Sequence, residues 1–281
     1  MNVPETIAGI AAGATAGEVI FPTTTEMAIK VQRLLGDPDC SADELIRLVQ
    51  ADPLLATRVV AVANSVLYNR SGQDAANIKS AVSRLGFKTL RVLAAAVVVR
   101  QMESMAQTAE HRTMARQLWE RTAHVAALAQ LIARRVTGQD PDTAFFAGIV
   151  HEVGSFYLIA RGGDFPGLLE GTDGSLSAWD DGGNAEVGRA VLQQLKVPGA
   201  VMEAVESLWA GYLAIPPVSL GDTLLLACQL APVESPLARL AGSAREGTRV
   251  QIDVALDQAT LSSILQESED EVASLIGALY A

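Results

Sequence analysis

The stretch that most constrains the fold is residues 140–160, DPDTAFFAGIVHEVGSFYLIA, where a long apolar run carries a histidine and a glutamate at its centre. The length and apolar character of the run predict a buried helix. Burying His151 and Glu152 costs free energy unless each has a partner, which could be a metal ion, a hydrogen-bonding group or water in a pocket. The sequence therefore predicts a polar site inside a helical core.

The composition favours an all-α fold. The 281 residues are 49% hydrophobic and 19% charged, so the chain can form a large core. Only 5% are aromatic, whereas Ala, Leu and Val are abundant, which is typical of helices rather than of a β-sandwich or barrel. The net charge of -11 repels polyphosphates, so nucleic-acid or anionic-membrane binding would require a local basic patch.

The sequence predicts a cytoplasmic protein without a membrane segment. Its strongest apolar run, residues 92–99, is far shorter than the roughly 20 residues of a membrane span. No basic region precedes an apolar run at the amino terminus, as it would in a signal peptide. Cys40 and Cys228 lie far apart without CxxC spacing, which favours thiols in a reducing compartment, although the two could still pair.

Several polar pairs are predicted to cap helices rather than to bind ligands. Asp52 and Pro53 have the residue types of an N-cap and first helical position. Asn64 and Ser65 are expected to end that helix, because asparagine tolerates left-handed geometry and its side chain can bond freed backbone groups.

A turn at Leu85 and Gly86, between a helix over 78–85 and a long apolar helix, is similar to a helix-turn-helix. Three basic residues lie near it: Arg84, Lys88 and Arg91. These side chains could contact DNA phosphates, but the second helix is too apolar for a solvated groove and the chain is acidic. DNA binding is therefore the weakest of the functions considered.

The chain is predicted to begin with an amino-terminal arm (1–20), which is either loose or a weak helix. Two helical subdomains follow, about 21–105 and 110–215, divided at the polar stretch 103–112. The Gly- and Asp-rich residues 161–183 are expected to form a long loop or lid. The Pro-containing residues 215–217 are expected to link to a helical extension, 216–281. Its helices, over 220–231, around 261–265 and over 272–279, should pack on the second subdomain.

The motif AFFAGIVHEVG, which ends at Gly154, resembles the signature of the HDOD domain. Two upstream segments are similar to the same family in order and spacing: FPTTTEMAIKVQRLLGDPDCSADELIRLVQADPLLATRVVAVANSVLYN (21–69) and IKSAVSRLGFKTLRVLA (78–94). The resemblance extends over about 21–215. HDOD domains are the non-enzymatic branch of the HD phosphohydrolase superfamily, so the resemblance implies an all-α bundle and a degenerate HD site.

In enzymatic relatives, a histidine, an adjacent His-Asp pair and a later aspartate hold metal ions that activate water. The resemblance aligns the first of these positions with Arg121, the pair with His151 and Glu152, and the last with Cys228. Asn184 stands where the family often has another histidine. A guanidinium cannot be a metal ligand, so we expect no metal or other cofactor. Arg121 is expected either to form an ion pair with Glu152 or to be a solvated arginine on a helix face.

The resemblance implies a non-catalytic bacterial signal-transduction or regulatory module that acts by binding proteins. Partners of this kind include a response regulator, a sensor kinase or a cyclic-diguanylate enzyme. We expect binding at the surface between the two bundles or at the rim of the vestigial pocket, and a homodimer is compatible with the sequence. The alternative is a metal-dependent phosphohydrolase whose site is rebuilt from His124, His151 and Glu152.

Overall fold

In the computed structural model, helices joined by turns and loops, and no strand, make up the described residues, which are 2–19, 21, 26–37, 39–171, 175–211, 213–241, 262–263, 265–266 and 269–280. The helices are α1 (Val3–Thr15), α2 (Glu26–Leu34), α3 (Ala42–Gln50), α4 (Pro53–Ala63), α5 (Ile78–Gln101), α6 (Ala109–Ile132), α7 (Pro141–Val150), α8 (Val153–Arg161), α9 (Asn184–Gln194), α10 (Gly199–Ala210), α11 (Leu220–Leu230), α12 (Ala238–Ala241) and α15 (Glu269–Tyr280). Short 3-10 or π segments lie at Met102–Met105, Ala133–Thr137, Gly162–Asp164 and Trp179–Gly183. The all-α fold is confirmed.

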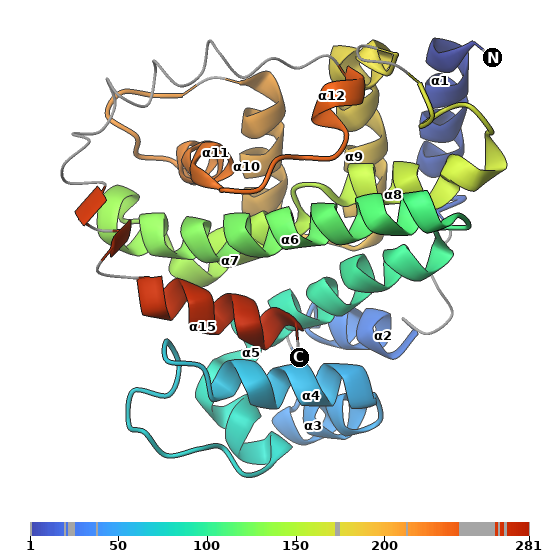
Figure 1. Cartoon of the computed structure of the whole chain (residues 1–281). Coiled ribbons are helices and arrows are strands. Elements are labelled where there is room, and N and C mark those ends of the chain that lie inside the picture. Colours follow the sequence, from blue (N-terminus) through green and yellow to red (C-terminus); the bar gives the residue numbers. More distant parts are fainter. Residues whose placement is uncertain are drawn as a thin grey trace.

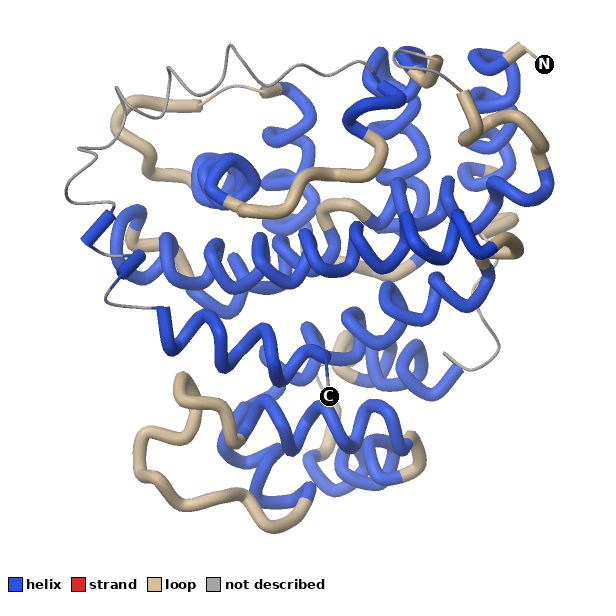
Figure 2. Tube along the Cα trace, in the orientation of Figure 1, coloured by secondary structure: helices blue, strands red, loops and turns tan. Residues whose placement is uncertain are grey.

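Helix α6 crosses the middle of the molecule and contacts helices on both sides (Figure 1). Helices α3 and α4 lie at one end, and α9, α10 and α11 lie on the opposite side of α6 (Figure 2). The buried apolar side chains form one continuous cluster from Ile7 to Leu279. The predicted division into two subdomains at 103–112 stays a prediction, and both predicted parts share this core. Helices α2 to α5 are called the first bundle, and helices α6 to α11 the second bundle.

The close packing of α7 on α6 depends on a glycine. A Cβ atom built on Gly148 would lie 2.4 Å from the Cα of Ala126, which is backbone and cannot rotate away. Farther along α6, Trp119 packs edge-on against Phe156 of α8, with ring centroids 6.5 Å apart. These contacts fix α6 relative to both helices that flank the His151–Glu152 pair.

The predicted caps at both ends of α4 are present, with one difference. The Asp52 side chain accepts hydrogen bonds from the backbone amides of Leu54 and Leu55, and Pro53 occupies the first turn. Asn64 keeps right-handed helical geometry, so the expected left-handed cap is wrong. Its side-chain oxygen instead accepts from the amide of Ala75 at 2.7 Å, because the chain after α4 returns close to the helix end.

The remaining motif residues of the first bundle shape its turns. Ser65 is buried and donates to the carbonyl of Val62 at 2.7 Å. At the predicted turn in α5, Gly86 has φ 73° and ψ 173°, a backbone conformation that favours glycine, and the preceding Leu85 is buried. The helix consequently bends at the predicted position.

The single helix expected over 140–160 is in fact two helices. Helix α7 ends at Val150, His151 and Glu152 form a turn, and α8 begins at Val153. The break allows the His151 ring to contact the carbonyl of Gly148 in the last turn of α7, which satisfies one of the groups that a helix end leaves free. The stretch Pro141–Asp164 is apolar and long enough to cross a membrane, but 89% of its apolar window is buried inside the protein.

Of the two expectations for the amino terminus, a loose arm or a weak helix, the structure has a helix, α1. Its buried face, which includes Ile7, Ile10 and Ala14, packs on α9 and on Trp179–Gly183. The spacing of these residues is that of one helical face, which explains why the segment folds onto the second bundle instead of extending away from it.

The segment 161–183, which is expected to form a long loop or lid, consists mainly of short 3-10, π and turn segments within its described residues, and part of it packs against the core. Leu168, Leu176 and Trp179 are buried, and the amide of Leu176 donates to the carbonyl of Leu240 at 2.7 Å. The Gly and Asp content suggested a loop, but these large apolar side chains supply burial that holds the segment in place. A role of this segment as a lid stays a prediction.

The carboxy-terminal part agrees with the predicted extension at α11 and departs from it at α15. Helix α11 packs on α6 and α10 of the second bundle, as expected, and Asp222 fixes the preceding proline-containing turn. Helix α15 contacts α6 of the second bundle, as expected, but also contacts α4 and so bridges the two predicted subdomains. The predicted helix around 261–265 falls partly on residues outside those described.

Candidate functional site

Arg121, on α6, points into the core and has three contacts. Its Nη1 donates to the carbonyl of Val233 at 2.7 Å and its Nη2 donates to the carbonyl of Cys228 at 3.0 Å. Its Nε lies 3.8 Å from Oε1 of Glu152. Arg121 is only 5% exposed, so this is a buried cation held between one carboxylate and two backbone carbonyls.

His151 occupies the turn between α7 and α8 and is 3% exposed. Its Nδ1 lies 2.7 Å from the carbonyl oxygen of Gly148, which assigns the ring proton to Nδ1 and leaves Nε2 as the unprotonated nitrogen. Burial lowers the pKa of His151; the charge of Glu152 opposes this effect and the charge of Arg121 adds to it. The ring is therefore neutral at pH 7.

Both carboxylate oxygens of Glu152 have polar neighbours. Oε2 accepts a hydrogen bond from the hydroxyl of Ser155 at 2.6 Å, and Oε1 faces Arg121. Oε1 also lies 4.0 Å from His151 Nε2, a distance too long for a direct hydrogen bond. The buried negative charge is thus compensated by protein groups.

Asn184 begins α9 on the side of the site that faces α8. A Cβ atom on Gly154 would lie 3.2 Å from Asn184 Oδ1 and 3.0 Å from the backbone of Gly188. Gly154 therefore allows the two helices to approach closely, which is a packing role. Among the described residues, Asn184 Oδ1 and His151 Nε2 are buried without a hydrogen-bond partner.

The rebuilt metal site considered from the sequence is not assembled. His124 lies one turn beyond Arg121 on α6, and its Nδ1 faces the carbonyl of Glu120 in its own helix at 2.9 Å. Within the described part of the chain, no three His, Cys, Asp or Glu side chains converge as a metal site requires. His124, His151 and Glu152 are therefore not brought together.

The groups that do converge do not fit a divalent cation. His151 Nε2 and Glu152 Oε1 could supply two ligands, but the fixed guanidinium of Arg121 lies beside that same carboxylate oxygen and would repel a second cation. Cys228 contributes its backbone carbonyl to Arg121. This arrangement can hold the helices together, and it offers no assembled set of ligands to activate water.

The basic residues near the Gly86 turn are engaged within the protein. Arg84 donates to the carbonyls of Ala63 and Gln73, and Lys88 forms an ion pair with Asp140 at 3.1 Å. Arg91 donates to the carbonyl of Leu35. These contacts, together with the burial of the helix that follows the turn, argue against the DNA-binding alternative.

Sequence reasoning missed some polar residues around the site. Ser155 was detectable, because a serine three residues after Glu152 lies on the same helical face. A second buried group was not: the hydroxyl of Tyr68 donates to Asp142 and accepts from Gln130, each at 2.9 Å. These three residues come from the loop after α4, from α7 and from α6, and no local pattern joins them.

The sequence matches the HDOD domain family over residues 21–170, and no curated protein matches it. Three solved structures are similar in fold. One, from Shewanella amazonensis SB2B, is described provisionally as a metal-dependent phosphohydrolase (24% identity, 99% of this chain and 100% of that chain, TM-score 0.69). Another is an HDOD domain protein of unknown function from Geobacter sulfurreducens (21% identity, 98% of each chain, TM-score 0.61).

The third is a protein from Marinobacter aquaeolei VT8, described provisionally as a signal transduction protein (18% identity, 93% of this chain and 60% of that chain, TM-score 0.54). At these identities the structures show a shared fold. The family match covers more than half of the sequence and includes the motif around His151. The chain belongs to the HDOD domain family.

Proposed function

We propose that this HDOD protein is a bacterial cytoplasmic regulatory module that acts by binding signalling proteins and that does not hydrolyse phosphoesters. The observation that carries the proposal is the buried Arg121 guanidinium, which contacts Glu152 and two backbone carbonyls where metal-binding relatives would need a ligand. A signalling role is also supported by the family and by the description of the Marinobacter relative.

Electrostatics supports the absence of metal-dependent catalysis. A catalytic metal ion requires several converging ligands and at least one open position for water. Here the positive charge is already present on a side chain that remains protonated at any physiological pH, and its hydrogen-bond donors are directed at protein acceptors. The positive charge at this site therefore belongs to a fixed side chain and not to a metal ion that could be exchanged.

The partners that we propose are a response regulator, a sensor kinase or a cyclic-diguanylate enzyme, bound at the surface between the two helical bundles. A core in which the central arginine and glutamate are paired is suited to presenting a fixed surface. The chain carries 21 Lys and Arg against 32 Asp and Glu residues, so electrostatic steering favours partners with a basic docking face.

The first test measures metal content and hydrolysis together. The purified, untagged protein is incubated with manganese, iron and zinc, desalted and analysed by elemental mass spectrometry, and is then assayed with phosphodiester and nucleotide substrates. We expect far less than one ion per chain and no turnover above the His151→Ala control. About one ion per chain that is lost in His151→Ala, together with turnover, would contradict the proposal.

The second test addresses binding. The tagged full-length chain is used for affinity capture from a bacterial lysate, with an unrelated acidic helical protein of similar size as the control. We expect selective enrichment of a receiver-domain protein, a sensor kinase or a cyclic-diguanylate enzyme, confirmed by direct binding of the purified pair. No selective partner of these classes would count against the interaction role.

A further inference from the structure

Helix α15 lies across the boundary between α4 of the first bundle and α6 of the second (Figure 1). The face of α15 that packs on the protein carries Leu275, Ala278 and Leu279, which are all buried. Their spacing of three and four residues forms one apolar stripe. Helix α15 also has a polar contact with the first bundle, because the backbone amide of Val66 donates a hydrogen bond to the hydroxyl of Ser274 at 3.0 Å.

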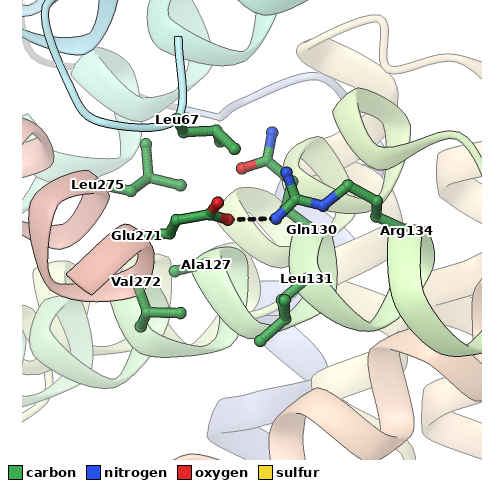
Figure 3. A pocket seen from close by; sticks show the side chains of 8 residues that line it. All are labelled: Leu67, Ala127, Gln130, Leu131, Arg134, Glu271, Val272 and Leu275. Carbon is green, nitrogen blue, oxygen red and sulfur yellow. Dashed lines mark hydrogen bonds and ion pairs between the residues drawn. The ribbon is translucent and has the colours of Figure 1, made fainter. Parts of the chain in front are cut away.

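The surface that receives α15 is a groove lined by apolar side chains, one amide and the positive charge of Arg134. Leu67 comes from the first bundle, whereas Ala127, Gln130 and Leu131 come from α6 and Arg134 comes from the π segment that follows it (Figure 3). Arg134 forms an ion pair with Glu271 in the first turn of α15. A gap of about 10 Å³ remains between the helix and the groove.

We propose that this groove recognises an amphipathic helix of a signalling partner and that α15 occupies it in the free protein. The matching partner helix has an acidic residue in its first turn opposite Arg134 and aliphatic residues four and eight positions later. These correspond to Glu271, Leu275 and Leu279. The inference rests on the proposed function and identifies where, and by which kind of helix, the partner binds.

Three features make α15 replaceable. It has 12 residues, a length at which an isolated helix is marginal in water, so its helicity depends on the groove. Its ion pair is partly exposed, with 25% of the Arg134 side chain and 33% of the Glu271 side chain accessible, so this contact is weak. The groove is also lined by side chains from both bundles, so replacing α15 with a partner helix would change contacts in both bundles.

A partner helix that binds the groove must compete with α15, which is part of the same chain as the groove. A segment of the same chain has an effective concentration that can reach the mM range, so a free helix binds detectably only when it is tighter or when α15 is weakened. Weakening α15 without altering the groove is thus the decisive manipulation. Glu271 and Leu279 belong to α15, and substitutions there leave Arg134, Leu67 and the rest of the groove unchanged.

The test is fluorescence anisotropy with a labelled peptide of residues 269–280, added to the full-length chain. We expect the affinity for the peptide to rise roughly tenfold in Glu271→Arg and more in Leu279→Asp, because each variant weakens the resident helix. A peptide with aspartate at positions 275 and 279 should not bind. The double variant Arg134→Glu, Glu271→Arg restores an ion pair within the chain and should bind the peptide no better than wild type.

Equal peptide affinities in wild type and Glu271→Arg would overturn the proposal, even if Leu279→Asp proves too unstable to use. Light scattering on each variant measures the oligomeric state and so tests whether a second copy of the chain occupies the groove. A dimer whose formation depends on protein concentration would show that α15 of a second copy fills the groove, which would also overturn it. Neither result affects the metal and hydrolysis measurements, so the proposed function is tested separately.

Discussion

Arg121 of α6 and Arg134 of the π segment that follows α6 form the same kind of ion pair in different surroundings. Arg121 pairs with Glu152 inside the core, where their side chains are only 6% and 14% exposed. Arg134, two residues beyond the end of α6, pairs with Glu271 at the edge of the α15 groove, where both side chains are partly accessible. The inner arginine also donates to two backbone carbonyls, and the outer one supports a helix from a distant part of the chain.

The difference shows how burial separates a fixed contact from an exchangeable one. Removing one partner of a buried pair leaves an uncompensated charge and costs about 3–5 kcal/mol, although the intact pair need not stabilise the fold by that amount. An exposed pair contributes about 0–1 kcal/mol. The Arg121–Glu152 pair is therefore suited to fixing the fold, and the Arg134–Glu271 pair is suited to being broken by a competing ligand.

The largest effect is expected for Arg121→Met. This variant leaves Glu152 without its cation and removes the donors to Cys228 and Val233, so the free energy of unfolding should fall by about 3–5 kcal/mol. Urea denaturation followed by circular dichroism measures the change. The paired control is Arg121→Met with Glu152→Leu, which should recover the part of the loss that comes from the uncompensated carboxylate. A loss below about 1 kcal/mol in the single variant would remove the distinction between the two ion pairs.

A second variant tests the close contact between α7 and α6, the helix that positions Arg121. Gly148→Ala would place its methyl group 2.4 Å from Ala126 Cα, so α6 and α7 would have to separate. Such overpacking costs about 1–3 kcal/mol. Gly199→Ala is the matched control, because a Cβ atom there meets no atom within 4 Å. Equal stability of the two variants in urea denaturation would show that the α6–α7 contact adjusts freely.

The pH dependence of stability tests the neutral state of His151. Its folded pKa lies below the ordinary value of 6.5, so the unfolded chain binds the proton more readily. The stabilising contribution is present above pH 6.5 and is lost as the pH falls from 6.5 towards the folded pKa, by up to about 1.4 kcal/mol per pH unit. Urea denaturation at several pH values should show a flatter profile for His151→Gln. Identical slopes in the two proteins would contradict a buried neutral imidazole.

The smallest effect is expected for Glu271→Gln at the outer pair. The free energy of unfolding should change by less than about 1 kcal/mol, and the change should shrink when the salt concentration is raised. Urea denaturation at low and high salt measures both quantities, with Glu269→Gln in the same helical turn as the control. A loss comparable to that of Arg121→Met would make α15 a fixed part of the core and would argue against its exchange.

Much of the fold could be predicted from local sequence signals. The cap at Asp52 and Pro53 and the turn at Gly86 depend on residues within a few positions of one another, so short-range spacing is sufficient to find them. The Arg121–Glu152 contact was expected only because the resemblance to the HDOD family aligned those positions. Nothing in the spacing of the two residues predicts it.

The features that could not be predicted depend on long-range packing. Arg134 and Glu271 are separated by 137 positions, and neither has a local pattern that indicates the other. The break at His151 was missed because apolar residues continue on both sides of it, and periodicity alone does not mark a turn within such a run. Buried leucines and Trp179 in the 161–183 segment were outweighed by its glycine content, which led to the prediction of a lid.

The hydrogen bonds of Arg121 also bear on evolutionary reversibility. Its two acceptors are main-chain carbonyls, which persist whatever side chains occupy positions 228 and 233. A histidine at position 121 would leave those carbonyls without their arginine donors before any set of metal ligands was complete. A path from arginine to a metal ligand at this position would thus pass through a destabilised intermediate, so the two carbonyl contacts favour keeping the arginine.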